Sequence, residues 1–87
     1  MNYFFCGIGG IGMSAIALAL KANGQTVSGS DRSFDKNENK EMRQRLEEKG
    51  ITIYPQDGSG ISKKTDILVV STAVEESIPD VKKAQQL

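Results

Sequence analysis

Hydrophobic residues in this chain gather in short runs, and glycines and polar stretches separate the runs. Residues 3–6 carry aromatic and small apolar side chains and end at Gly7, a pattern typical of a strand buried on both faces of a parallel sheet. Residues 13–22 are rich in alanine, leucine and isoleucine almost all round, and Gly24 follows them. This second run predicts a well-buried helix that ends in a glycine C-cap.

The middle of the chain alternates between strand and helix patterns. β-branched and small residues over 26–30 predict a second strand, with Asp31 at its carboxyl end. Residues 32–39 are polar and predict a loop, whereas residues 40–49 have the periodicity of a surface helix. The helix pattern rests on Met42 and Leu46 and on the possible ion pairs Glu41/Arg45 and Arg43/Glu47.

The last third predicts two more strands and a helix. Residues 51–54 alternate as a strand until Pro55, and residues 56–65 form a polar, glycine-containing loop. The continuous apolar run 67–70 predicts a strand covered on both faces, and Pro79 suits the first turn of a helix. This alternation predicts an α/β fold, a Rossmann-like doubly wound domain with a mostly parallel sheet.

The length of 87 residues allows one domain, residues 1–87, with no room for a second catalytic domain. Because the chain ends inside the last predicted helix, we expect it to be a fragment of a longer protein. Eleven basic and eleven acidic residues cancel, so no overall field attracts nucleic acid or an anionic membrane. The longest apolar run is too short for a bilayer span, and no signal-peptide pattern is present, which favours a cytoplasmic location. With one cysteine and no histidine, we expect no internal disulfide and no structural zinc or other metal site.

Gly7, Gly9 and Gly12 satisfy the GxGxxG spacing of a phosphate-binding turn between a strand and a helix. The spacing has a mechanical reason, since it permits a tight turn, close approach of the backbone to a phosphate, and close helix–strand packing. The unpaired amides of the first helical turn, roughly half a positive charge in effect, then face the anion. The preceding apolar strand and the following helix favour phosphate binding over a turn that is glycine-rich for structural reasons alone.

Asp31 follows the second strand, nineteen residues after Gly12, where a carboxylate can accept hydrogen bonds from a ribose or a base. The alternative is a turn-capping role within residues 30–33. Ser71, Thr72 and Ala73 follow the fourth strand, at the edge where open α/β sheets bind ligands, although such residues are also ordinary in loops. Cys6 lies in a predicted buried strand and has no histidine partner, which favours packing over nucleophilic chemistry.

Several chemical signatures are missing from the sequence. It contains no GxxxxGK[ST] motif for ATP, no histidine for acid–base work, and no close acidic pair suited to a metal. We therefore expect no catalytic residue in this chain, and any bond-making chemistry would occur elsewhere in a longer protein.

The segments GIGGIGMSAIA, VSGSD, RLEEKGITI and LVVSTAV, in this order, resemble the N-terminal domain of the Mur ligases. Within that family the resemblance is closest to the branch that joins L-alanine to UDP-N-acetylmuramate. It implies a domain that binds the UDP part of UDP-N-acetylmuramate, with further ligase domains in cis that bind ATP and magnesium and admit the amino acid. The whole ligase would activate a carboxylate as an acyl phosphate with ATP, and this chain alone would bind without catalysing.

The resemblance also implies roles for single residues. Asp31 would meet the uridine, and Ser71, Thr72 and Ala73 would close the pocket. Two departures from the family pattern concern the pocket rim: Gln56 stands where relatives often carry a histidine, and residues 77–80 replace the more usual Asn-Pro-Glu. The residues that would line the diphosphate are Gly9, Gly10, Ile11, Gly12, Met13 and Ser14.

Three other interpretations stay open from the sequence alone. The same glycines and Asp31 suit an NAD(P)-binding Rossmann domain of a dehydrogenase or of a regulatory protein. A related ligase branch recycles a tripeptide onto the same UDP-sugar, although its glycine segment is typically less regular. A folded interaction module with a purely structural glycine turn is the third.

Overall fold

The computed structural model of the chain describes residues 1–70 and 79–86. The sheet consists of β1 (Asn2–Cys6), β2 (Thr26–Ser30), β3 (Thr52–Ile53) and β4 (Ile67–Val70). The helices are α1 (Ile11–Ala22), α2 (Arg32–Asp35), α3 (Lys40–Glu48) and α4 (Pro79–Gln86). None of the described helices is long and apolar enough to cross a membrane.

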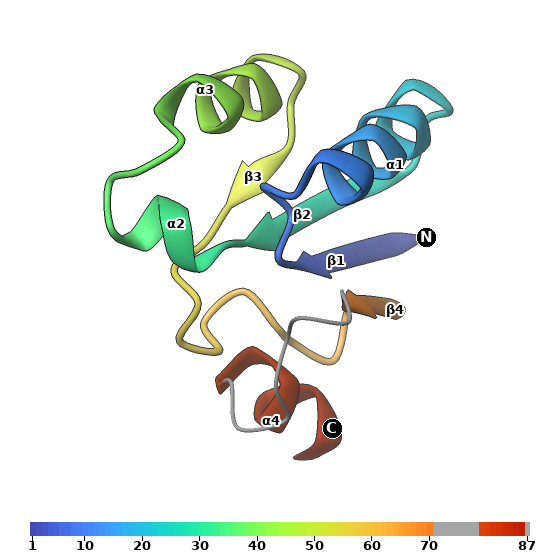
Figure 1. Cartoon of the computed structure of the whole chain (residues 1–87). Coiled ribbons are helices and arrows are strands. Elements are labelled where there is room, and N and C mark those ends of the chain that lie inside the picture. Colours follow the sequence, from blue (N-terminus) through green and yellow to red (C-terminus); the bar gives the residue numbers. More distant parts are fainter. Residues whose placement is uncertain (71–78, 87) are drawn as a thin grey trace.

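The four strands form one sheet in the order β3-β2-β1-β4, and every neighbouring pair is parallel. In Figure 1, α1 and α3 lie on one face of the sheet and α4 lies on the other. This arrangement confirms the predicted Rossmann-like, doubly wound fold. The strand order reverses at β1, which pairs with β2 on one side and with β4 on the other. The carboxyl end of β1 is therefore the switch point at which open α/β sheets bind their ligands.

The hydrophobic core lies between the sheet and the helices α1 and α3. Phe4, Phe5 and Cys6 are fully buried, which confirms that the first strand is covered on both faces. On one face, a cluster of buried residues joins the sheet to the helices, and on the other Phe4 packs near the ring of Tyr54 at a centroid distance of 6.3 Å. The cluster consists of Phe5, Ile8, Ala17, Val27, Phe34, Leu46 and Ile51.

Helix α1 begins two residues earlier than predicted and is less buried. Only Ser14 and Ala17 are buried, while Ile11 is 88% exposed and Ile16 is 52% exposed. The prediction of a well-buried helix was wrong, because α1 packs on the sheet along one face and the described residues leave much of its opposite, apolar face open. The predicted C-cap is confirmed: Gly24, at a φ of +85°, ends the helix, and the next amide donates to the carbonyl of Leu20 at 3.1 Å.

The prediction for β4 also needs correction. Its first three residues are half-buried and Val70 is 46% exposed, because β4 has β1 as its one partner and forms an edge of the described sheet. β3 is shorter than the predicted run 51–54, since Ile51 packs into the core before the strand begins and Pro55 follows closely. In α3, the Arg43–Glu47 ion pair is present at 3.5 Å, but the predicted pair Glu41/Arg45 does not form.

The polar segment 32–39 is not wholly a loop, because it begins with the short helix α2. The Asp31 carboxylate caps this helix by accepting from the backbone amide of Ser33 at 2.9 Å. Phe34, 1% exposed, anchors the helix in the core. The side-chain cap and the one buried aromatic ring thus stabilise α2, although the segment lacks the longer periodic apolar pattern from which a helix is usually predicted.

Candidate functional site

The glycine turn joins the end of β1 to the start of α1 and is tied to β2. The amides of Gly7 and Ile8 both donate to the carbonyl of Ser30, at 2.8 and 3.0 Å, and the amide of Gly10 donates to the carbonyl of Gly7 at 3.2 Å. Gly7 has a φ of +89°, a backbone conformation that side-chain-bearing residues rarely adopt. The turn is therefore a rigid feature of the fold at the carboxyl edge of the sheet.

Among the described residues, no side chain caps the N-terminus of α1. Gly10 occupies the N-cap position without a side-chain hydrogen bond, and the first turn contains no acidic residue. The amide of Ser14 makes the first helical bond, to the carbonyl of Gly10 at 2.8 Å. The amides of Ile11, Gly12 and Met13 precede that bond, so helix geometry leaves them without an intrahelical acceptor. Ile11 is 88% exposed and Gly12 is exposed, so the first turn of α1, at the positive end of the helix dipole, lies at the surface of the described structure.

The glycines of the turn differ in whether the fold requires them. A Cβ on Gly9 would lie 2.9 Å from Oδ2 of Asp31 and 3.0 Å from the Phe34 ring, so a side chain there would force these two neighbours to shift. A Cβ on Gly10 would lie 3.6 Å from its nearest neighbour, the carbonyl oxygen of Gly7, which is ordinary contact. A Cβ on Gly12 would meet no described atom within 4 Å. Packing among the described residues explains Gly9 but not Gly10 or Gly12.

Asp31 is engaged within the protein. Its Oδ2 accepts from the amide of Gly9 at 2.8 Å, and its Oδ1 accepts from the amide and the hydroxyl of Ser33 at 2.9 and 2.7 Å. The capping role that the sequence offered as an alternative is therefore present in the structure. The role toward a uridine stays a prediction, and among the described residues Oδ2 accepts one bond, so the carboxylate has a lone pair left for a further donor.

The other predicted site residues fall into two groups. Met13 is half-buried and packs against the core cluster, and Ser14 is buried with its hydroxyl donating to the carbonyl of Ile11 at 3.0 Å. Residues 71–73, predicted to close the pocket, lie outside the described residues. The register nevertheless pairs Val70 with Cys6, so the chain leaves β4 at the same edge as the glycine turn.

Sequence reasoning missed a buried polar cluster behind the turn. The Asp80 carboxylate, fully buried in the first turn of α4, accepts from the hydroxyl of Ser30 and from the amide of Gly58, the latter at 2.7 Å. The side-chain amide of Gln56 lies 3.4 Å from the Ser30 hydroxyl and 3.5 Å from the Cys6 sulfur. Gln56 and Asp80, which both belong to the departures from the family pattern, thus each contact the hydroxyl of Ser30. The only sequence signal was that departure, because the contacts join residues up to fifty positions apart.

Burial dominates the electrostatics of this cluster. It raises the pKa of Asp80 above its usual value, against the opposing effect of the hydrogen bonds from Ser30 and Gly58. Burial, followed by the negative charge of Asp80, also raises the pKa of the Cys6 thiol to about 11. The thiol is therefore protonated near neutral pH, as expected for a packing residue rather than a nucleophile.

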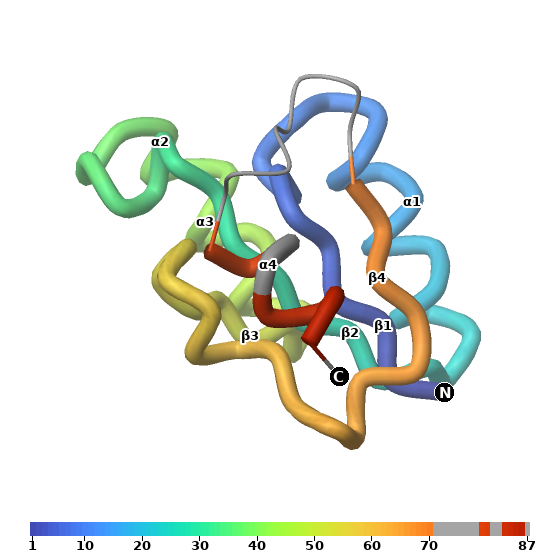
Figure 2. The backbone as a smooth tube through the Cα atoms, turned by 90° about the horizontal axis from the view of Figure 1, so that it is seen from below, coloured from blue at the N-terminus to red at the C-terminus, as the bar shows by residue number. Residues whose placement is uncertain are grey.

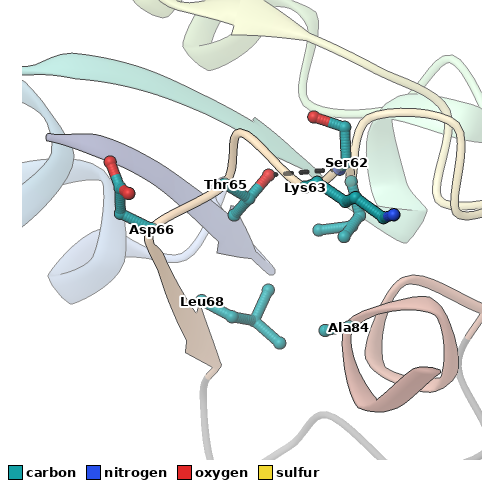
Figure 3. A pocket seen from close by; sticks show the side chains of 7 residues that line it. Ser62, Lys63, Thr65, Asp66, Leu68 and Ala84 are labelled. Carbon is teal, nitrogen blue, oxygen red and sulfur yellow. Dashed lines mark hydrogen bonds between the residues drawn. The ribbon is translucent and has the colours of Figure 1, made fainter. Parts of the chain in front are cut away.

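A pocket of about 450 Å³ lies away from this edge of the sheet. Figure 3 shows Leu68 of β4 and Ala84 of α4 facing one another across it, with Lys63 and Asp66 among its lining residues. Because Asp66 directly precedes β4, the pocket lies toward the amino ends of the strands, opposite the glycine turn. One of its polar groups also serves the fold, because Oδ2 of Asp66 accepts from the amide of Asn2 at 2.8 Å. Across the described parts of the chain, no three acidic, histidine or cysteine residues gather in a way that could hold a metal ion.

Comparison with known proteins finds similar chains among ligases. UDP-N-acetylmuramate–L-alanine ligase of Rhodopseudomonas palustris (strain TIE-1) is 48% identical over 77 residues, which cover 88% of this chain and 15% of that protein. The enzyme of the same name from Desulforapulum autotrophicum is 42% identical over 87 residues, which cover 98% of this chain and 18% of that protein.

Solved structures agree with these relatives. The crystal structure of UDP-N-acetylmuramate-alanine ligase from Thermotoga maritima matches with a TM-score of 0.83 and 34% identity, covering 99% of this chain and 19% of that one. A murein peptide ligase from Psychrobacter arcticus matches with a TM-score of 0.75 and 28% identity, covering 99% and 17%. The chain thus spans less than a fifth of the length of these relatives. The family model described as "Mur ligase family, catalytic domain" matches residues 2–87, and the chain therefore belongs to the Mur ligase family.

Proposed function

We propose that this chain is the UDP-sugar-binding part of a ligase that joins L-alanine to UDP-N-acetylmuramate, and that the amides of Ile11, Gly12 and Met13 hold the diphosphate. The observation that carries the proposal is the pair Gly10 and Gly12. Both could bear a Cβ without a clash with the described protein, and both lie at the uncapped N-terminus of α1. Close approach of a ligand explains why neither position carries a side chain.

Position and electrostatics support an anionic ligand at this place. The turn lies at the switch point between β2 and β4, where doubly wound sheets bind nucleotides. Three amides without an intrahelical acceptor, together with the helix dipole, would stabilise a phosphate without a lysine or arginine. The relatives' names supply the rest of the proposal, since they specify UDP-N-acetylmuramate and alanine.

The proposal places the chemical step outside this chain. The sequence has no GxxxxGK[ST] motif, which is a common means of holding ATP with its magnesium ion. In the proposed ligase, other domains in cis would bind both and supply the amino acid. Residues 1–87 would hold the nucleotide end of the substrate and contribute binding and orientation.

Calorimetric titration of the chain with UDP-N-acetylmuramate, UDP and NADH tests the proposal. We expect the UDP-sugar and UDP to bind and NADH not to bind. A millimolar dissociation constant, about 4 kcal/mol of binding free energy, would suffice, because the remaining domains would add contacts in the whole ligase. Binding of NADH without binding of either uridine ligand would overturn the proposal in favour of a dinucleotide-binding domain.

A further inference from the structure

We infer that Asp80 is a positioning residue for the glycine turn, which it holds in place through Ser30 without touching the ligand itself. This inference rests on the proposed function, because the turn matters as the entrance to the diphosphate site. The hydrogen-bonded connection that carries it is nevertheless a property of the chain alone.

Two consecutive hydrogen-bonded steps link Asp80 to the turn. The hydroxyl of Ser30, the last residue of β2, donates to Oδ2 of Asp80. The carbonyl of the same Ser30 accepts from the amides of Gly7 and Ile8 at 2.8 and 3.0 Å. The side chain of Ser30 is thus fixed by α4, and its backbone fixes the first two residues of the turn.

The hydrogen-bond directions in the cluster are consistent with this role. Ser30 has one hydroxyl proton, and the carboxylate of Asp80 takes it in preference to the Cys6 sulfur 4.0 Å away. The lone pairs of the hydroxyl then accept from Nε2 of Gln56 at 3.4 Å, and the same amide group also reaches Cys6. Every buried side-chain nitrogen and oxygen in the described residues has a partner, so no buried polar side-chain atom of the cluster is left unsatisfied.

The position of the carboxylate favours a specific role over an incidental one. Asp80 is 0% exposed, and its described partners are a hydroxyl and a backbone amide, both neutral. Burying a carboxylate is unfavourable unless such bonds stabilise it. Asp80 also joins separate parts of the chain, since α4 lies on the sheet face opposite α1 while the turn leads into α1 (Figures 1 and 2). The carboxylate therefore connects α4, through hydrogen bonds, to the end of the sheet that carries the turn.

Hydrogen exchange in the ligand-free chain, followed by UDP-sugar titration, tests the inference with Asp80→Ala, Asp80→Asn and the control Gln85→Ala. Asparagine can keep both contacts with the direction of one reversed, because its carbonyl can accept from the amide of Gly58 while its amide donates to the hydroxyl oxygen of Ser30. Gln85→Ala truncates an exposed side chain of the same helix. We expect Asp80→Ala to accelerate exchange at Gly7 and Ile8 by about 10- to 100-fold, and more than at Val27 in the core of β2. Asp80→Asn and Gln85→Ala should stay near the wild type.

The affinity for UDP-N-acetylmuramate should fall in Asp80→Ala and recover in Asp80→Asn. Uniform acceleration at all amides, or unchanged exchange at Gly7 and Ile8, would overturn the inference and leave Asp80 a general stabilising residue. If Asp80→Ala does not fold, Ser30→Ala decides the matter, because it removes the same bond by deleting one hydroxyl. If the wild-type chain does not bind the UDP-sugar, the proposed function fails, and the exchange data still show whether Asp80 fixes the turn.

Discussion

Replacing Gly12 by alanine adds one methyl group where no described atom lies within 4 Å, so the change separates binding from folding. Within a helix, alanine is more stable than glycine by roughly 0.5–1 kcal/mol. For a domain of this size each kcal/mol shifts the melting temperature by about 4–8 °C, so Gly12→Ala should raise it by about 2–8 °C. The methyl group would meet an incoming phosphate, and we expect the affinity for UDP-N-acetylmuramate to fall about tenfold or more, equivalent to about 1.4 kcal/mol.

Gly9→Ala is the matched substitution with the opposite expected effect on stability. Its Cβ would lie 2.9 Å from Oδ2 of Asp31 and 3.0 Å from the ring of Phe34. Such overpacking costs about 1–3 kcal/mol, so the melting temperature should fall by about 4 °C or more. Ala19→Val, two turns along the exposed side of α1, controls for added bulk and should leave the affinity unchanged.

Thermal unfolding by circular dichroism and titration calorimetry on the three variants give both quantities. Our reasoning would be refuted if Gly12→Ala bound the UDP-sugar as tightly as the wild type. It would equally fail if Gly12→Ala lowered the melting temperature as much as Gly9→Ala does, because the glycine would then serve the fold.

Further substitutions and titrations test other parts of the structure. Phe34→Ala should destabilise the chain by about 3–5 kcal/mol, measured by urea unfolding, because the ring is fully within the core; a loss under 1 kcal/mol would contradict its placement. Asp31→Ala should cost about 0.5–2 kcal/mol through loss of the α2 cap, and an unchanged stability would mean that the cap contributes nothing. The Cys6 thiol should resist alkylation at pH 8 in the folded chain and react once urea unfolds it, since burial raises its pKa to about 11; rapid reaction of the folded chain would contradict this. Burial raises the pKa of Asp80 in the folded chain, so the wild type is most stable below the usual pKa of an aspartate and becomes less stable as the pH rises through the pKa of the folded state. Asparagine does not titrate, so the stability of Asp80→Asn relative to the wild type should increase from pH 4 to 7. The nearby acids Asp57 and Asp35 are the same in both proteins. A constant difference between the two proteins in urea unfolding would contradict the assigned direction.

Local sequence patterns sufficed for most of the fold because the chain alternates strands and helices regularly. The apolar run before Gly7 and the β-branched residues before Asp31 predicted β1 and β2, and the glycine spacing predicted the turn between β1 and α1. α2 was missed because four residues are too short for a periodic pattern. Its signal, a cap at Asp31 followed by Phe34, becomes visible only when the aromatic ring is known to be buried.

The degree of burial and the long-range contacts could not be predicted in the same way. The composition of α1 suggests full burial, yet Ile11 and Ile16 are exposed, because exposure depends on which other elements cover the helix. Asp80 resembles a helix-starting acid in the sequence, and its burial against Ser30 follows from how α4 docks on the sheet. Of the candidate site, the sequence could predict the turn but not which glycines the fold itself requires.

The central claim is that a diphosphate lies on the first-turn amides of α1, and backbone amide shifts measured by NMR during titration with UDP test it most directly. We predict the largest shifts at Ile11, Gly12 and Met13, with small shifts around Leu68 and Ala84 in the distant pocket. Saturating shifts confined to that pocket, or no shift at the three amides while UDP binds, would contradict the account.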